Sequence, residues 1–241
     1  MESRQDGRVW EAVGRLELSG RAFCTGALIE PRLVLTAAHC LFDPETGERV
    51  RAEDIQFLAG WRNGRAAAYR HVRKAEPHPE YDFAAASDAS RVRVDIALLE
   101  LQHPIQDGAI IPFETDARPE TGASVGVVSY AHDRSEAPTL QELCSVLSRQ
   151  QGVLVLSCSV DFGSSGSPVF SFESGSPRIV SVVSAKAEAN GEPVSLGTSL
   201  AGPLAELRKI MDAPQGLRLN GTSSLRAGSR NTTTGAKFVK P

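Results

Sequence analysis

Three residues of this chain have the types that nucleophilic and acid–base catalysis requires: a serine, a histidine and an aspartate. The serine, Ser165, lies in Gly163-Ser164-Ser165-Gly166-Ser167-Pro168, where the glycines allow the backbone to turn sharply. A serine hydroxyl becomes a strong nucleophile only when a neighbouring base removes its proton. The backbone N–H groups of Gly163 and Ser165 could then stabilise the charge that forms on a substrate oxygen. Alone, however, such a run is typical of a flexible turn between strands.

Two largely apolar segments upstream of this serine are each adjacent to one residue that could act with it, a histidine and an aspartate. His39 follows residues 33–38 and precedes Cys40, and Asp95 precedes residues 96–101. Alone, each would be interpreted as a core group or a strand end. Together with Ser165 they predict a triad, in which Asp95 orients His39 and His39 takes the proton of the serine hydroxyl.

The order of the three residues along the chain, His39, Asp95 and then Ser165, discriminates between folds that share this chemistry. The serine segment also resembles the nucleophile elbow of α/β-hydrolases, but that fold places its histidine after the serine. Here all five histidines precede the serine: His39, His71, His78, His103 and His132. A subtilisin-like order needs an aspartate before the histidine, and Asp6, in a polar segment, is the one candidate. Both alternatives are therefore excluded.

The three motifs in this order resemble those of the trypsin/chymotrypsin family of serine proteases. The resemblance covers residues 9–211 and is carried by Thr36-Ala37-Ala38-His39-Cys40, by Asp95-Ile96-Ala97-Leu98-Leu99 and by the Ser165 segment. That last segment is similar to its counterpart in bacterial glutamyl-endopeptidase-like branches. The family implies an all-β fold of two six-stranded antiparallel β-barrels with a short C-terminal helix. It also implies an active site between the barrels and a serine endopeptidase that forms an acyl-enzyme intermediate.

Short apolar runs separated by Gly, Pro, Asn and Asp support an all-β body. They occupy residues 10–18, 24–29, 33–35, 55–59, 95–101, 124–130, 153–158, 168–172 and 178–183. A periodicity near 3.6 over residues 203–211 predicts a short helix, which in the family packs on the second barrel. We therefore expect an N-terminal barrel over 1–112, a C-terminal barrel with its helix over 113–212, and a flexible basic tail over 213–241.

Composition and charge restrict the classes of partner. The chain has a net charge of −3, and its basic residues are not gathered into the clusters that bind nucleic acid. No apolar run is long enough to span a bilayer, and residues 1–20 do not form a signal peptide. We expect a monomer that acts on protein or peptide substrates, with no cofactor, no metal, no nucleic acid and no membrane association. A native signal segment is expected to have been removed, which places the protein outside the cell or in the periplasm.

The four cysteines fall into two close pairs, Cys24 with Cys40 and Cys144 with Cys158. An even count of this kind favours an oxidising compartment. The family resemblance implies a disulfide between Cys24 and Cys40, beside the histidine. For Cys144 and Cys158 two interpretations stay open, a second disulfide or two buried reduced thiols.

The resemblance also predicts which residues form the substrate pocket. Ser159, six residues before the nucleophile, would form its base, and Val183, Ser184, Ala185 and Lys186 its wall, with Ser195 and Gly197 behind. Ser159 offers no negative charge, so a preference for Arg or Lys is not expected. Val183 stands where glutamate-specific relatives have a histidine, so a strict preference for Glu is not expected either. Lys186 could attract an acidic group or be a solvated surface lysine. Asp161 and Phe162 could narrow the site.

Two departures from the family pattern concern activation. Many members carry an aspartate before the nucleophile, which pairs with an N-terminal amine that is released by cleavage before Ile-Val-Gly-Gly. Here that position is Ser164, and the N-terminal segment has no such start. We therefore expect activity that does not depend on a freed amine. The altered serine segment also leaves an alternative open, a catalytically silent family member that acts as a binding or regulatory module.

The remaining histidines include two candidate metal ligands. His71 and His78 have a spacing that could suit a metal, but no cysteine or carboxylate cluster accompanies them at ligand spacing. His78, in a His-Pro-x-Tyr segment, is interpreted as structural.

Overall fold

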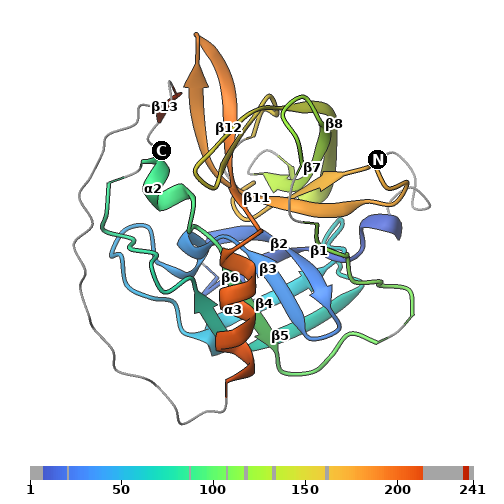
Figure 1. Cartoon of the computed structure of the whole chain (residues 1–241). Coiled ribbons are helices and arrows are strands. Elements are labelled where there is room, and N and C mark those ends of the chain that lie inside the picture. The colour runs from blue at the N-terminus through green and yellow to red at the C-terminus, as the bar shows by residue number, and fades with distance from the viewer. Residues whose placement is uncertain are drawn as a thin grey trace.

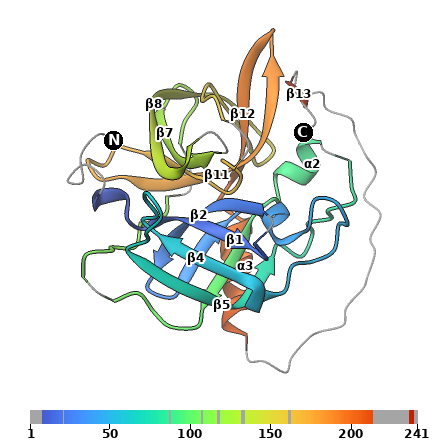
Figure 2. The ribbon, with the colours of Figure 1, turned by 180° about the vertical axis from the view of Figure 1, so that it is seen from behind.

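The computed structural model describes residues 8–20, 22–86, 88–106, 108–116, 119–131, 134–160, 163–213 and 236–238. Its strands form two antiparallel barrels that lie one against the other (Figure 1). The same two lobes are seen from behind in Figure 2. The sequence-based prediction of an all-β fold with two six-stranded barrels is confirmed.

The first barrel closes in the strand order β1-β2-β3-β6-β5-β4. Its strands are β1 (Val13–Leu18), β2 (Ala22–Glu30), β3 (Leu33–Thr36), β4 (Ile55–Ala59), β5 (Ala68–Pro77) and β6 (Ala97–Leu101). β3 and β6 pair directly, with Thr36 opposite Ala97. Because His39 follows β3 and Asp95 precedes β6, this pairing brings the two residues to the same end of the barrel.

The second barrel contains β7 to β12 and is closed by the pairing of β10 with β11. Its strands are β7 (Ser124–Ala131), β8 (Arg134–Gln150), β9 (Val153–Leu156), β10 (Pro168–Ser171), β11 (Arg178–Ala189) and β12 (Glu192–Ser199). A thirteenth strand, β13 (Ala236–Phe238), is added to the outer edge of β11. These three residues were expected in a flexible tail. They form a strand because the edge of β11 supplies backbone partners, and such pairing needs no apolar burial.

Helices are few and short. They are the 3-10 turns η1 (Arg8–Trp10), η2 (Ala38–Leu41) and η3 (Ala52–Asp54), and the α-helices α2 (Ala89–Val92) and α3 (Pro203–Asp212). α3 is the helix that the periodicity predicts, with Leu204 and Leu207 buried. No helix in the described ranges is long and apolar enough to cross a membrane.

α3 lies against β5 and β6 of the first barrel (Figure 1). The family resemblance predicts a position on the second barrel, and this prediction is wrong. Its two buried leucines join the large core cluster to which the first barrel contributes most members. The Lys74 ammonium on β5 donates to the Ile210 carbonyl at 3.0 Å, which satisfies a carbonyl in the last turn of the helix. Arg208 also pairs with Glu30 on β2.

An aromatic cluster joins the two barrels. Trp10 on η1 packs edge-on against Phe170 on β10, with ring centroids 4.9 Å apart. Phe113 lies in the connection between β6 and β7. Its ring centroid is 4.7 Å from that of Phe170 and 5.9 Å from that of Trp10. All three side chains are buried. One core cluster therefore contains residues of both barrels.

Both cysteine pairs are disulfides. Cys24 on β2 is bonded to Cys40 on η2, and Cys144 on β8 to Cys158 just after β9. The structure thus selects the disulfide interpretation for the second pair over two reduced thiols.

Candidate active site

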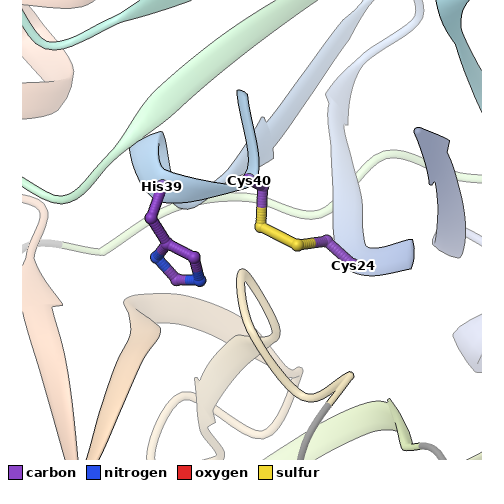
Figure 3. A group of neighbouring side chains, drawn as sticks. All are labelled: Cys24, His39 and Cys40. Atoms are coloured by element: carbon purple, nitrogen blue, oxygen red, sulfur yellow. A yellow bond between two sulfur atoms is a disulfide. The ribbon is translucent and has the colours of Figure 1, made fainter. Parts of the chain in front are cut away.

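His39 lies on η2, the single helical turn that follows β3. The same turn carries Cys40, whose disulfide to Cys24 ties it to β2 (Figure 3). The imidazole is part-buried, with 22% of the side chain exposed, so solvent can reach it. Constraint on both sides of the residue, from the end of β3 and from the disulfide, holds the histidine backbone in place.

Asp95 binds His39 through both carboxylate oxygens, one at the imidazole and the other at the backbone. Oδ2 lies 2.7 Å from His39 Nδ1, and Oδ1 accepts the His39 backbone N–H at 2.9 Å. The Ser184 hydroxyl also donates to Oδ2. A carboxylate bound to Nδ1 favours the tautomer with its proton on that nitrogen, which leaves Nε2 as a proton acceptor.

The carboxyl of Asp95 is only 3% exposed, so its ionisation needs compensation. Burial raises its pKa, but the charge of His39 and hydrogen bonds from His39 and Ser184 have the larger combined effect. The pKa of Asp95 is therefore lower than its ordinary value. The carboxylate is thus negative at neutral pH and can stabilise a positive imidazole.

Thr198 on β12 supports the backbone around Asp95. Its buried hydroxyl lies 2.6 Å from the Val92 carbonyl and 3.1 Å from the Asp95 carbonyl. This contact crosses from the second barrel to the first. Sequence reasoning missed Thr198 because a threonine in a strand carries no pattern that distinguishes such a role.

Ser165 occupies the second position of a tight turn. The Ser167 N–H donates to the Ser164 carbonyl at 3.1 Å, and Gly166 at the third position has φ = 76°. A turn of this geometry requires a residue that tolerates positive φ. A Cβ at Gly166 would also lie 2.1 Å from Thr36 Oγ1, so the glycine allows the turn to approach the first barrel.

The turn is held against the first barrel by backbone contacts. The Thr25 N–H on β2 donates to the Ser165 carbonyl at 2.9 Å, and the Thr25 hydroxyl donates to the Gly163 carbonyl at 3.1 Å. Gly163 has φ = 92°, and a Cβ there would lie 2.5 Å from the Phe23 ring. The second barrel thus presents the serine segment directly to the strand that carries Cys24.

Two N–H groups of this segment remain available. Within the described residues, neither Gly163 nor Ser165 donates a backbone hydrogen bond. Both N–H groups belong to the same short segment as the serine hydroxyl. Unbonded donors so close to a nucleophile have the chemistry of an oxyanion hole.

No hydrogen bond joins the Ser165 hydroxyl to His39 in the described part of the chain. Contacts between a catalytic nucleophile and its base are often long in a free enzyme and shorten when substrate binds. The histidine and aspartate are thus already paired, and the serine turn is held against Thr25 of the first barrel.

The structure distributes the predicted pocket residues over β11, β12 and the segment after β9. Val183 is buried and paired with Gly197 on β12, and Ser184 contacts Asp95, a second role that the sequence did not reveal. Ser195 is fully buried, and its hydroxyl has no hydrogen-bond partner among the described residues. The remaining positions are more open: Ser159 is exposed, and Ala185 and Lys186 are part-buried. Asp161 and Phe162 lie outside the described residues.

One group of possible metal ligands occurs in the described part of the chain, namely Cys24, His39 and Cys40 (Figure 3). Its two sulfur atoms are bonded to each other, so neither is a thiolate, the form of cysteine that binds metal. The buried His78 lies 3.3 Å from Glu206 of α3, a structural contact between a loop and the helix. His71 lies near Gln56 on the neighbouring strand.

Two antiparallel β-barrels, with a His-Asp pair on the first and a glycine-flanked serine turn on the second, are typical of chymotrypsin-like serine proteases. The trypsin family model matches residues 2–199. The chain therefore belongs to the trypsin family, which confirms the resemblance inferred from its motifs.

Individual relatives agree with this assignment. The chain is 31% identical over 147 residues to a trypsin of Simulium vittatum, an alignment that covers 54% of this chain and 55% of that protein. It is 29% identical over 114 residues to venom serine protease 34 of Apis mellifera, covering 45% of this chain and 28% of the relative. The chain thus spans about half the length, or less, of the curated relatives it matches.

Solved structures support the fold. A Glu endopeptidase superimposes with a TM-score of 0.69 at 18% identity, covering 84% of this chain and 90% of that one. A thermostable serine protease from an extremophilic microorganism gives the same TM-score at 15% identity, with coverage of 85% and 98%. At these identities the likeness concerns the fold alone.

Proposed function

We propose that this protein is a serine endopeptidase that uses His39, Asp95 and Ser165 as its catalytic residues. The observation that carries the proposal is the buried, ionised Asp95 bound to Nδ1 of His39 at 2.7 Å, on the barrel face that receives the Ser165 turn. This arrangement prepares the imidazole to accept a proton from a serine hydroxyl.

The reaction follows from these positions. Ser165 Oγ bonds to the carbonyl carbon of a peptide while its proton passes to His39 Nε2. The C–N bond then breaks, the leaving amine takes the proton from His39, and an acyl group remains on Ser165. Water attacks this ester in the same manner, with His39 again carrying the proton, and an acid is released. The N–H groups of Gly163 and Ser165 stabilise the oxyanion, and Asp95 stays ionised throughout.

The substrates are proteins or peptides. An extended peptide can pair with the edge of a strand. We place such pairing along β11 beyond Val183, where the serine turn is bonded to the same edge. The substrate side chain before the cleaved bond enters a pocket on the second barrel. Its proposed residues are Ser159, Val183, Ser184, Ala185, Lys186, Ser195 and Gly197. None of these residues carries a carboxylate that would select Arg or Lys. The two disulfides favour action outside the cytoplasm, in a secreted or periplasmic protein.

A fluorophosphonate probe tests this proposal, because it reacts covalently only with an activated serine. The wild-type chain should be labelled and should cleave casein, whereas Ser165→Ala should lose both properties and keep its fold. Ser174→Ala is the matched control, because this exposed serine lies in the turn between β10 and β11, and its loss should change neither property. Labelling of Ser165→Ala at the wild-type rate would refute the assignment.

The alternative function is that of a catalytically silent family member that binds partners. The missing hydrogen bond between Ser165 and His39 in the described residues favours it. A well-folded wild-type chain that neither reacts with the probe nor cleaves casein would select this alternative.

A further inference from the structure

The two edges of β11 have different neighbours. On one side β12 pairs with it from Ser181 to Ala189. On the other side β10 pairs with residues 178–182, and the serine segment then makes two backbone bonds to Val183. Gly166 donates to the Val183 carbonyl and the Val183 N–H donates to the Ser167 carbonyl, each at 2.9 Å. This second edge therefore leads directly away from the active site.

Farther along the same edge, β13 is paired with β11. Phe238 lies opposite Ala187, Lys237 opposite Glu188, and Ala236 opposite Ala189, in antiparallel register. At about 3.3 Å per residue, the Phe238 end of β13 is paired about 10 Å along β11 from Ser184, which contacts Asp95. Figure 1 shows the short strand beside the long hairpin of β11 and β12.

The direction of β13 matters for the site. Because the pairing is antiparallel, the chain runs along β11 from Ala189 toward Ala187, and thus toward Ser184. A peptide that pairs with this edge in the same direction delivers its following residues to Ser165. β13 therefore approaches the active site with the polarity of a substrate segment that precedes the cleaved bond.

We propose that the chain's own segment Ala236–Phe238 is an internal occupant of the edge of β11 along which substrate pairs. The segment competes with the part of a substrate that precedes the cleaved bond, an inference that rests on the proposed protease function. The register places the basic residue Lys237 opposite the acidic residue Glu188. Covalent attachment gives the segment a high local concentration, while three paired residues bind weakly enough for a substrate to displace it.

Proline substitutions in the full-length chain separate backbone pairing from side-chain effects. Successive residues of an antiparallel strand alternate in bonding toward and away from a given neighbour. Either Lys237 or Phe238 must therefore direct its N–H toward β11, and proline removes that N–H. The test uses Lys237→Pro and Phe238→Pro, and the matched controls Lys237→Ala and Phe238→Ala keep the backbone donor.

The first readout is binding, which needs no catalysis. In chains that also carry Ser165→Ala, a fluorescein-labelled peptide with the sequence of residues 235–241 is titrated by NMR and fluorescence polarisation. At least one proline variant should bind it at least about threefold more tightly than the chain with an unaltered tail, because the internal competitor is displaced. The alanine controls should bind the labelled peptide with an affinity close to that of the chain with an unaltered tail. Equal affinity in all chains would overturn the proposal.

The second readout is cleavage of a fluorogenic peptide by the chains that retain Ser165. The same proline variant should show a KM at least about twofold lower with unchanged kcat, as expected when a competitive occupant is removed. A KM that stays unchanged while peptide binding improves would overturn the competition. If no chain cleaves the peptide, the proposed protease function fails, and the binding experiment still decides whether the edge is occupied.

Discussion

The carboxylate of Asp95 shows how single residues determine the chemistry of this site. Both of its oxygens are engaged, one by the His39 backbone and the other by the imidazole and Ser184. Each contact favours the charged form, which compensates for its burial. The same contacts fix the ring orientation, so charge and geometry at this position depend on one another.

Replacing Asp95 with asparagine tests that dependence. Asp95→Asn keeps the shape of the side chain but favours the wrong imidazole tautomer, so kcat should fall by about ten-thousandfold. Active-site titration with the fluorophosphonate probe and casein cleavage would measure the loss. A decrease of less than about tenfold would contradict the role of Asp95.

The same variant makes a prediction about pH. The pKa of Asp95 is lower in the folded protein than its ordinary value of 3.8, so its ionised form stabilises the fold above that pH. This contribution is lost as the pH falls through the lowered pKa. Asp95→Asn should therefore lose less stability than the wild type on acidification below pH 3.8, as measured by Tm. Identical acid sensitivity in both proteins would contradict the prediction.

At the scale of elements, the serine turn depends on a close approach between barrels. Gly166 combines a positive φ with a position where a Cβ would lie 2.1 Å from Thr36 Oγ1 and 2.4 Å from the Thr25 carbonyl. One of these contacts is to backbone, which cannot rotate away. The turn thus requires glycine both for its conformation and for its docking.

Gly166→Ala should lower the free energy of unfolding by about 3 kcal/mol or more and reduce labelling of Ser165, because the turn must move away from the first barrel. Gly175→Ala is the matched control. Gly175 has nearly the same φ, 79°, but nothing lies within 4 Å of its Cβ position. The control should cost only about 1 kcal/mol. Urea unfolding of both variants gives the comparison, and equal losses would show that the close approach is unimportant.

In the molecule as a whole, the proposed active site is divided between the barrels. His39 and Asp95 belong to the first barrel, and Ser165 belongs to the second. Their relative position depends on the aromatic contacts that join the barrels, in which Phe113 touches both Trp10 and Phe170. A substitution that destabilises these contacts should therefore also lower the reactivity of Ser165.

Phe113→Ala should lower the free energy of unfolding by about 3 kcal/mol and slow the reaction of Ser165 with the probe, because a cavity forms between the barrels. Ile111→Ala is the matched control in the same connection. That side chain is 72% exposed, and its truncation should change stability by no more than about 0.5 kcal/mol. Urea unfolding and probe kinetics measure both effects. Wild-type labelling by a destabilised Phe113→Ala would contradict the link.

The sequence by itself determined the family, the all-β fold, the candidate triad and most of the strongly apolar strands. These features depend on local signals: a histidine beside a cysteine, a glycine-flanked serine, and apolar runs between turn residues. The runs failed to predict β5, β8 and β12, which are richer in polar residues. In β5, for example, charged and polar residues alternate with the few buried ones. Such a strand is stabilised by its neighbours, so its own pattern is weak.

Other features were decided only by the tertiary structure. Ser184 and Thr198 support Asp95 from strands that are distant in sequence, and nothing in their local patterns marks that contact. The position of α3 on the first barrel depends on which core accepts its two leucines. β13 forms because an edge of β11 offers backbone partners to a segment that cannot build a core. In each case the stabilising interaction is non-local, since it joins residues whose proximity exists only after the chain has folded.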